Sequence, residues 1–293
     1  MQLISALFFW LLVFVIRLIP FRLLYVLSDF MAFVLHRVFA YRKEVVTENL
    51  KACFPEKDAS EINQLIRLSY RNLSDILIEG IKGFSMNPQK DQKRYQLLNP
   101  ELLEKYQQQH KDIMMVTGHY SNWEWGSLFL PTQMHYDNLL VLYKPLKNKY
   151  LDHYLRKHRE RFHMAIRSMY HTPKAFAEFR NRQTIFTLVA DQSPSNVSSS
   201  YWINFLGRQT AFLHGIEHYT RLYDLPLVYL DIQRKKRGFY ELELSLLTEE
   251  PLTLSDGELT TLYARQLEKV IRQKPEDWLW SHKRWKHQPP SSL

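Results

Sequence analysis

The stretch Ile113-Met114-Met115-Val116-Thr117-Gly118-His119-Tyr120-Ser121-Asn122-Trp123-Glu124 joins an apolar run to a polar turn. The four apolar residues at 113–116 are typical of a buried strand. A histidine follows shortly after this strand, and a glutamate lies five positions beyond the histidine. A base and a carboxylate in one turn at the end of a strand indicate a reaction centre.

Two interpretations of this turn are open. In the first, Ser121 and Glu124 form a capping box at the start of a helix, so Glu124 is structural and His119 is a loop residue. In the second, His119 lies in the turn before the helix and Glu124 in its first turn. Only this arrangement lets them converge, because five positions on a continuous helix turn about 500° and leave the side chains about 140° apart. Glu124 would then accept the proton of one imidazole nitrogen, leaving the other as a general base.

The composition excludes several classes of site. A chain of 293 residues with 45% hydrophobic residues can bury a sizeable core as one large or two small domains. Only 8 glycines occur, and neither glycine-rich nucleotide-loop motif is present. The single cysteine, Cys53, excludes an internal disulfide and a cysteine-built zinc site. Its amphipathic surroundings predict a buried structural thiol.

The N-terminus is strongly apolar. Residues 3–16 are almost wholly apolar, and a second apolar stretch reaches Val38. The first run is shorter than the roughly 20 residues of a spanning helix and lacks the basic start and small-residue cleavage site of a signal peptide. Its aromatics and the neighbouring Arg17 predict a membrane anchor, either a short span with a snorkelling arginine or an in-plane helix pair. A buried helical hairpin of a soluble protein is the alternative.

The charge indicates the partner. A net charge of +9 favours phosphate groups, on nucleic acid or on anionic lipid. The basic residues Arg37, Arg42 and Lys43 follow the apolar region, which favours a body on the cytoplasmic side of a membrane. Together with the apolar N-terminus, this predicts a lipid bilayer as partner and no nucleic acid.

The remaining chain predicts an α/β fold. Apolar residues recur at helical spacing over 44–83, with a break near Pro55, and a loop is expected at 87–94. Beyond a short helix at 100–109, apolar runs at 113–116, 139–142, 185–189 and 227–230 alternate with helical segments, and a further strand at 240–247 pairs with the last of these runs across a basic turn. This alternation predicts a mixed, mainly parallel central sheet flanked by helices. We expect a membrane-anchoring helical segment at 1–40 and a second domain at 41–293, made of a helical lead-in at 41–110 and an α/β core at 111–293. The tail after Pro289 is expected to be disordered.

Further polar groups follow other strands. Asp191 and Gln192 come directly after the strand at 185–189, and ligands of open α/β sheets bind at strand carboxyl ends. We therefore expect His119 and Asp191 to share one crevice, although a turn or cap carboxylate is the alternative for Asp191. Another group follows the strand at 139–142, where a solvated charged face is the alternative. Its members are Tyr143, Lys144, Pro145, Asn148, Asp152, Arg159 and Arg161.

Taken in order, these motifs resemble those of the lipid A biosynthesis acyltransferases, the late acyltransferases of the lysophospholipid acyltransferase superfamily. The family's H-x-x-N-W-E resembles the turn from His119 to Glu124, and its Y-R-P followed by a helix and two arginines resembles the run from Tyr143 to Arg161. Its acidic pair after a strand resembles Asp191-Gln192. Two later motifs also match, at Phe205, Gly207 and Gly215 and at Pro275, Glu276, Trp280, His282, Arg284 and Lys286.

The resemblance implies transfer of a fatty acyl chain from a thioester of acyl carrier protein or coenzyme A to a hydroxyl of a glycolipid, most directly a lipid A precursor, at the inner (cytoplasmic) membrane with the catalytic domain on the cytoplasmic face. His119 would be the base and Glu124 would orient it. The implied substrate-binding residues are Asn122, Lys144, Asn148, Arg159, Arg161, Asp191 and Gln192. No metal or cofactor is implied. Lys144 replaces the usual arginine, Lys149 replaces a proline and Ser193-Pro194-Ser195 departs from the usual stretch, so acceptor identity is open.

Other functions remain as alternatives. The acceptor could be another glycolipid or an amino-acid lipid. Ser121 could be a nucleophile, although no G-x-S-x-G elbow surrounds it. His119, Glu124 and Asp191 could bind a divalent ion, although the H-E-x-x-H spacing is absent. Finally, the chain could be a non-catalytic basic adaptor at a membrane surface or on nucleic acid.

Overall fold

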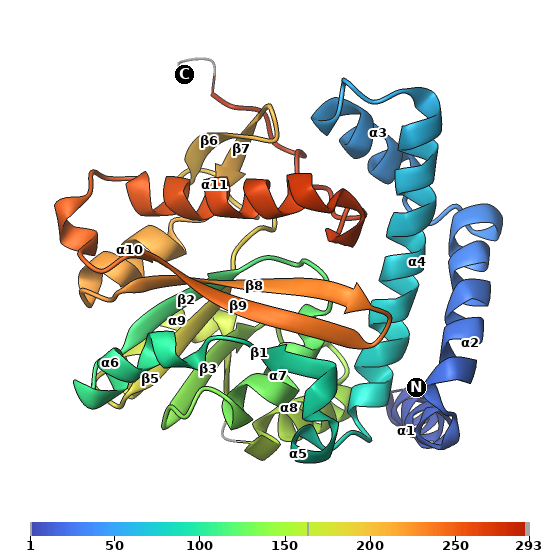
Figure 1. The fold of residues 1–293 in the computed structure, drawn as a ribbon, viewed down its shortest axis with the longest axis horizontal. Helices are drawn as coiled ribbons and strands as arrows, with labels where there is room; N and C mark the ends of the chain where they lie inside the picture. Colours follow the sequence, from blue (N-terminus) through green and yellow to red (C-terminus); the bar gives the residue numbers. More distant parts are fainter. Residues whose placement is uncertain (1, 163, 291–293) are drawn as a thin grey trace.

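A central sheet organises the molecule. The computed structural model describes residues 2–162 and 164–290, and the sheet within it has the strand order β1-β9-β8-β2-β5-β3-β4 (Figure 1). β8 and β9 pair antiparallel and every other neighbouring pair is parallel. The strands are β1 Tyr95–Leu97, β2 Ile113–Thr117, β3 Asn138–Tyr143, β4 Met164–Ser168, β5 Thr184–Val189, β8 Leu227–Lys236 and β9 Phe239–Thr248. The predicted mixed, mainly parallel sheet is confirmed.

A separate hairpin lies beside the central sheet. It consists of β6, Tyr201–Phe205, and β7, Arg208–Phe212. Leu206 and Gly207 form its two-residue turn with φ of 53° and 76°, the left-handed backbone that short hairpin turns require. The sequence reasoning missed this hairpin together with β1 and β4. All four strands have at most five residues and none consists of a continuous apolar run.

Helices cover both faces of the sheet. Their bounds are α1 Gln2–Leu18, α2 Phe21–Phe33, α3 Lys43–Cys53, α4 Ala59–Gly83, α5 Pro88–Asp91, α6 Glu104–Gln108, α7 Gly126–Phe129, α8 Lys149–Arg159, α9 Thr172–Phe179, α10 Gly215–Leu222 and α11 Glu258–Gln273. The predicted break near Pro55 separates α3 from α4. The loop expected at 87–94 is instead two short helices, because Asn87 caps α5 and Pro88 occupies its first position.

The strands are buried on both sides. Along β2, Met114 and Val116 face a cluster with α10 and α11, while Ile113 and Met115 face a second cluster with α6 and α7. Successive side chains of a strand point to opposite faces, so a doubly covered sheet needs a continuous apolar run. This explains why the central strands could be predicted from apolar runs in the sequence.

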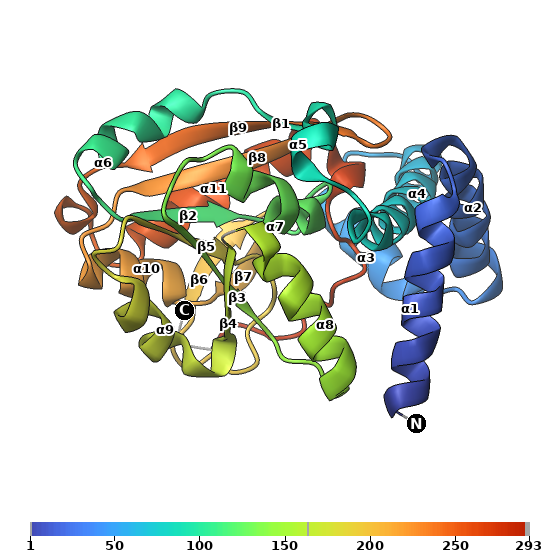
Figure 2. The ribbon, with the colours of Figure 1, turned by 90° about the horizontal axis from the view of Figure 1, so that it is seen from below.

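Helix α4 stands across one end of the sheet. The turn between β8 and β9 approaches it, and α1 and α2 pack on its outer side (Figures 1 and 2). Because β8 runs parallel to β2 and β5, this is the end where those strands have their carboxyl termini. A ligand crevice at this end would therefore lie between the strand ends and α4.

The N-terminal helices leave apolar side chains uncovered. On α1 the exposed residues recur at helical spacing and include Ile4, Phe8, Leu11 and Phe14. On α2 they include Leu23, Val26, Phe30 and Phe33. Among the described helices, no single one is long and apolar enough to cross a membrane, although the segments Phe21–Val38 and Lys43–Cys53, bent by 91°, pass that test as a pair.

Candidate active site

The imidazole of His119 is bound by Asp191. His119 follows β2 and Asp191 follows the neighbouring β5, so both lie at one sheet edge. The two oxygens of Asp191 contact His119 Nδ1 at 2.5 Å and its backbone N–H at 2.8 Å. A Cβ on Gly118 would lie 3.2 Å from Asp191 Oδ2 and 2.8 Å from Leu267 Cδ1, so a larger residue here would have to displace one of these side chains. The prediction that His119 and Asp191 lie together at one sheet edge is confirmed.

Asp191 is charged and fixed. Trp278 Nε1 donates to Oδ2 at 2.7 Å, and the carboxylate is buried. Burial alone would raise the pKa of Asp191, but the charge of His119 and the hydrogen bonds from His119 and Trp278 lower it to about 2. An ionised carboxylate that accepts the Nδ1 proton leaves the Nε2 lone pair of His119 free to act as a base.

Gln192 contacts the other imidazole nitrogen. Its Nε2 lies 3.1 Å from His119 Nε2, which suits an amide that donates to a neutral imidazole. Burial lowers the pKa of His119, but the Asp191 charge and hydrogen bond, with a smaller effect of Glu124, leave it raised above 6.5. Trp123 packs edge-on against the imidazole, with ring centroids 5.1 Å apart.

Glu124 binds Arg159, and the prediction that it holds the His119 imidazole is wrong. Glu124 Oε2 accepts from Arg159 Nη2 at 2.8 Å, whereas the Nδ1 position is taken by Asp191. Arg159 lies at the end of α8, so this ion pair connects α8 to the turn after β2. Glu124 remains close enough to raise the pKa of His119 through its charge.

The predicted capping box is also absent. Asn122 caps the short helix at 123–125, and its Oδ1 accepts from the Trp125 N–H at 3.1 Å. Ser121 has φ of 54°, and its buried hydroxyl has no hydrogen-bond partner within the described structure. The chain therefore reverses at Ser121 before the helix begins, and this displaces the cap by one residue.

A cavity of about 470 Å³ opens beside this turn. Its apolar wall is one face of α4, from Leu73 to Phe84, and Phe9 of α1 closes one side. The polar lining includes Glu124, His158, Arg159, Gln192 and His282, and Gln192 also contacts His119. A volume between 300 and 1,000 Å³ with an apolar wall and few polar groups is typical of a site for a small molecule or a lipid chain.

The other expected substrate contacts have different positions. Asn122 is fully buried and donates to Glu79 at 2.6 Å, so it supports the turn. Asn148 caps α8 and its Nδ2 donates to Gln2 O of α1 at 2.9 Å. Arg161 contacts His158, and Lys144 is exposed outside the cavity lining. Of the expected residues, the cavity brings together Glu124, Arg159 and Gln192.

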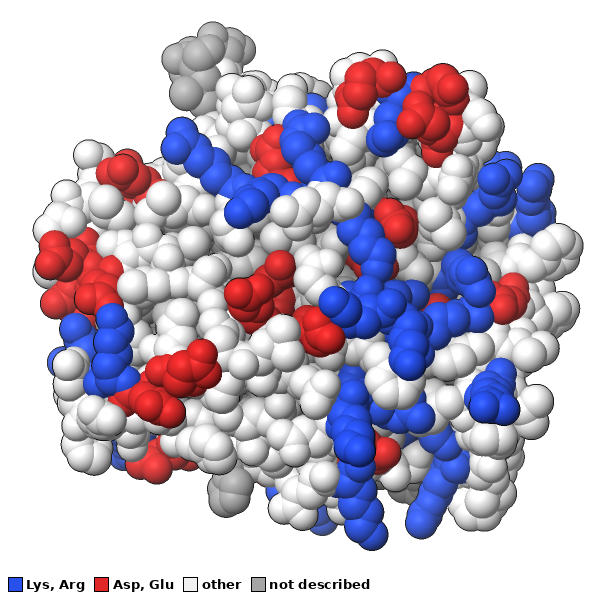
Figure 3. All heavy atoms as spheres, viewed as in Figure 1, with Lys and Arg blue, Asp and Glu red and all other residues white. Residues whose placement is uncertain are grey.

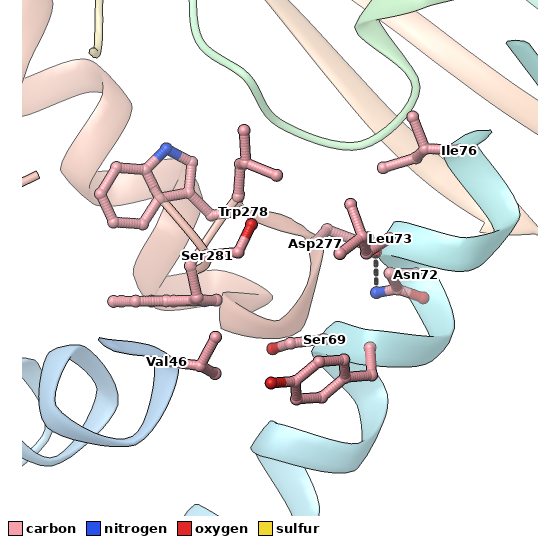
Figure 4. Close-up of a pocket in the computed structure, with 11 residues that line it drawn as sticks. Val46, Ser69, Asn72, Leu73, Ile76, Asp277, Trp278 and Ser281 are labelled. Carbon is pink, nitrogen blue, oxygen red and sulfur yellow. Dashed lines mark hydrogen bonds between the residues drawn. The ribbon is translucent and has the colours of Figure 1, made fainter. Parts of the chain in front are cut away.

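The tryptophan-rich C-terminal segment is part of the scaffold. Tyr120 and Trp278 form a β-bridge, and Ser121 N–H donates to Asp277 O at 2.8 Å. Figure 4 shows Asp277 and Trp278 beside α4, where Asn72 donates to Asp277 at 2.5 Å. Trp278 and Trp280 are buried, so these two side chains pack in the core.

Two groups that matter here were missed by the sequence reasoning. Trp278 orients Asp191, and Glu79 holds Asn122 from the interior of α4. Glu79 follows Asn72 and Asp75 at helical spacing on the buried side of α4, and polar residues recurring in this way within an amphipathic helix are the signal that could have found it. Across residues 2–162 and 164–290, no group of three or more His, Cys, Asp or Glu side chains is arranged to hold a metal ion.

Comparison with known proteins identifies the family of the chain. Residues 2–287 match the family of bacterial lipid A biosynthesis acyltransferases. The chain belongs to that family. It is 21% identical to the lipid A biosynthesis palmitoleoyltransferase of Escherichia coli strain K12, over 85% of this chain and 80% of that protein. It is 22% identical to the lipid A biosynthesis lauroyltransferase of the same strain, over 92% of this chain and 88% of that protein. A lipid A biosynthesis acyltransferase of Shigella flexneri is 21% identical over 85% of this chain and 80% of that protein.

Proposed function

We propose that this member of the lipid A acyltransferase family moves a fatty acyl chain from a thioester to a hydroxyl of a glycolipid, with His119 as general base. The observation that carries the proposal is the fixed Asp191–His119 pair, whose imidazole contacts Gln192 and Trp123 of the cavity lining. A lipid A precursor is the acceptor that the relatives' names favour. The donor is an acyl thioester of acyl carrier protein or coenzyme A, and no cofactor takes part.

The reaction begins when the acceptor hydroxyl replaces the exposed Gln192 amide at His119 Nε2. The imidazole takes the hydroxyl proton as the oxygen attacks the thioester carbonyl, and the ionised Asp191 stabilises the imidazolium that forms. The tetrahedral intermediate then collapses, the C–S bond breaks and the thiolate leaves, and the imidazolium gives its proton to the thiolate or to water, which restores the base. General-base catalysis contributes roughly 10²- to 10⁴-fold, so positioning of the two substrates supplies much of the remainder.

Arg159 is the cation that we assign to the developing negative charge. It lines the cavity and its guanidinium is held by Glu124, so its direction is set before the substrate arrives. Arg161 is less suited, because its guanidinium contacts His158. Glu124 thus acts through Arg159 in this mechanism and adds to the field that favours protonated His119.

The N-terminal helices support a position of the cavity beside a lipid surface. Phe9 of α1 lines the cavity while Phe8 and Phe14 of the same helix are exposed, so a membrane that covers the exposed stripe lies beside the opening. Lys and Arg side chains also gather over the β8–β9 turn, α4 and α2, where they can meet anionic headgroups (Figure 3). We therefore assign the protein to the inner membrane with this body on the cytoplasmic face, α1 and α2 lying in the plane of the interface.

Turnover tests the proposal. Purified protein, an acyl thioester of acyl carrier protein or coenzyme A, and an extracted lipid A precursor should yield a product one acyl chain heavier by mass spectrometry. His119→Ala should lower the rate by roughly 10²-fold or more while circular dichroism shows the variant to be folded at the assay temperature. Equal rates for wild type and His119→Ala would overturn the mechanism, and absence of product with every thioester would favour a non-catalytic membrane-surface protein.

A further inference from the structure

The buried carboxylate of Glu79, a residue of α4, joins three other segments by hydrogen bonds. Its side chain is 1% exposed. Oε2 accepts from Asn122 Nδ2 and from the Tyr240 hydroxyl, each at 2.6 Å, and Oε1 accepts from the Tyr25 hydroxyl at 2.8 Å. Removing one partner of such a network leaves a buried polar group unsatisfied, so its members depend on one another.

One arm of this junction ends in the turn of His119. Asn122 is bound at three points: its Nδ2 by Glu79, its Oδ1 by the Trp125 N–H, and its carbonyl by the Tyr95 hydroxyl at 3.0 Å. The backbone carbonyl of Glu79 also accepts from Trp125 Nε1 at 2.8 Å. Asn122 lies between His119 and Glu124 in the chain, so its position sets the path of the backbone that carries both.

Two glycines lie on the surface of α4 that faces the turn at 119–125. A Cβ on Gly83 would lie 3.2 Å from Trp125 Nε1, and one on Gly80 would lie 4.0 Å from the Glu124 Cβ. The contact between α4 and the turn is therefore tight at Gly83, whereas Gly80 leaves ordinary contact distance. Small displacements of α4 or of its buried carboxylate will reach the turn, because packed interiors transmit strain.

The other arm ends in α2, whose outer face is the uncovered apolar stripe. Tyr25 is the α2 residue that reaches Glu79, and its ring also lies under the Arg237 guanidinium at 4.7 Å. Tyr25 is flanked on the outer face by exposed Leu23 and Val26. A lipid surface that covers these side chains will fix α2, and with it the phenol that binds Glu79.

We propose that Tyr25 and Glu79 are positioning residues that link the seating of α2 on a lipid surface to the order of the His119 turn. The route runs from the Tyr25 hydroxyl through the Glu79 carboxylate to the Asn122 amide and the Trp125 N–H. Through this route, the turn at 119–125 is best ordered when a lipid surface covers the exposed apolar face of α2. This proposal rests on the proposed function for its catalytic consequence, but the coupling itself requires no substrate.

Hydrogen–deuterium exchange tests the coupling directly. Vesicles of mixed phosphatidylethanolamine and phosphatidylglycerol should slow exchange in peptides covering 119–125 by roughly 5-fold or more, because the Trp125 N–H is bound to Asn122 within the network. Tyr25→Phe removes one hydroxyl and keeps the ring. It should bind the vesicles like wild type and lose this slowing.

Two variants serve as controls. Tyr201→Phe removes a phenol that binds Asp256 on another surface, and it should keep the slowing. Ser28→Ala removes another buried α2–α4 hydrogen bond, to Asp75 at 2.6 Å, without touching Glu79, and it should also keep the slowing. Equal loss in Ser28→Ala and Tyr25→Phe would mean that any loosening of α2 suffices, which overturns the specific route.

Kinetics give the second readout. Tyr25→Phe and Glu79→Gln should lower kcat in the presence of vesicles by roughly 5-fold or more while KM for the thioester stays unchanged, because they misplace the base and leave the donor contacts intact. Thermal unfolding shows whether each variant folds. If Glu79→Gln does not fold, the kinetic test relies on Tyr25→Phe alone. The proposal is overturned if Tyr25→Phe keeps both the slowing of exchange by vesicles and the wild-type kcat. That result would leave the proposed acyl transfer by the wild type unaffected.

Discussion

At the residue scale, the strength of two ion pairs decides which carboxylate acts on the imidazole. Asp191 is buried and binds His119 at two points, whereas the side chains of Glu124 and Arg159 are 38% and 28% exposed. An exposed pair contributes about 0–1 kcal/mol, while loss of one partner of a buried pair costs about 3–5 kcal/mol. Asp191 is therefore the group on which the orientation and charge of His119 depend.

This assignment predicts a shift in the pH dependence of kcat. The base must be neutral, so kcat rises as the pH increases through the pKa of His119. Asp191 raises that pKa, so Asp191→Asn should lower it and move the rising limb to lower pH, with kcat reduced roughly 10²-fold or more. Glu124→Gln should move the limb less. Steady-state rates across pH measure both, and a larger shift in Glu124→Gln would restore Glu124 as the partner.

The sequence predicted where His119 and Asp191 would meet but not which carboxylate would bind the imidazole. Both residues directly follow strands, and parallel neighbouring strands end at the same edge. Glu124 was predicted to bind the imidazole because it lies only five positions after His119 in the sequence. The left-handed backbone at Ser121 turns it away, and a single serine gives no sign of such a conformation.

At the element scale, continuous apolar runs were the reliable signal. They located every central strand that is covered on both faces. The short strands β1 and β4 lie at the edges of the sheet, where fewer contacts select apolar residues. The sequence did not predict that α4 packs against the turn at 119–125. Glu79, Gly80 and Gly83 fit the pattern of an amphipathic helix, and only the structure shows that they face this turn.

The exposed stripe of α1 predicts binding to lipid vesicles. Phe8 and Phe14 are 68% and 57% exposed, so their replacement by serine leaves the fold intact and removes apolar area that a membrane would bury. Burial of a phenylalanine contributes about 1.5–3 kcal/mol, so the double variant should bind anionic vesicles roughly tenfold or more weakly in cosedimentation. Leu222→Ser with Leu252→Ser, also exposed but on other elements, should bind like wild type. Equal weakening in both pairs would contradict the assignment of α1 to the interface.

At the scale of the whole molecule, the site is assembled from distant segments. The cavity combines Phe9, the face of α4, the turn at 123–128, the end of α8 and the segment at 279–282. The order of the motifs along the chain predicted the family, and the match over residues 2–287 confirms it. The cavity wall could not be predicted, because apolar helical spacing does not tell a face that packs against the core from one that lines a cavity.

The central claim is that this chain adds an acyl group to a glycolipid through His119. Lipid mass spectrometry of cells in which the gene is deleted, and then supplied again as wild type or as His119→Ala, tests it most directly. We predict that deletion removes one acyl chain from a glycolipid, that wild type restores it, and that His119→Ala does not, although both proteins reach the membrane fraction in equal amounts. Restoration of the missing chain by His119→Ala would contradict the account.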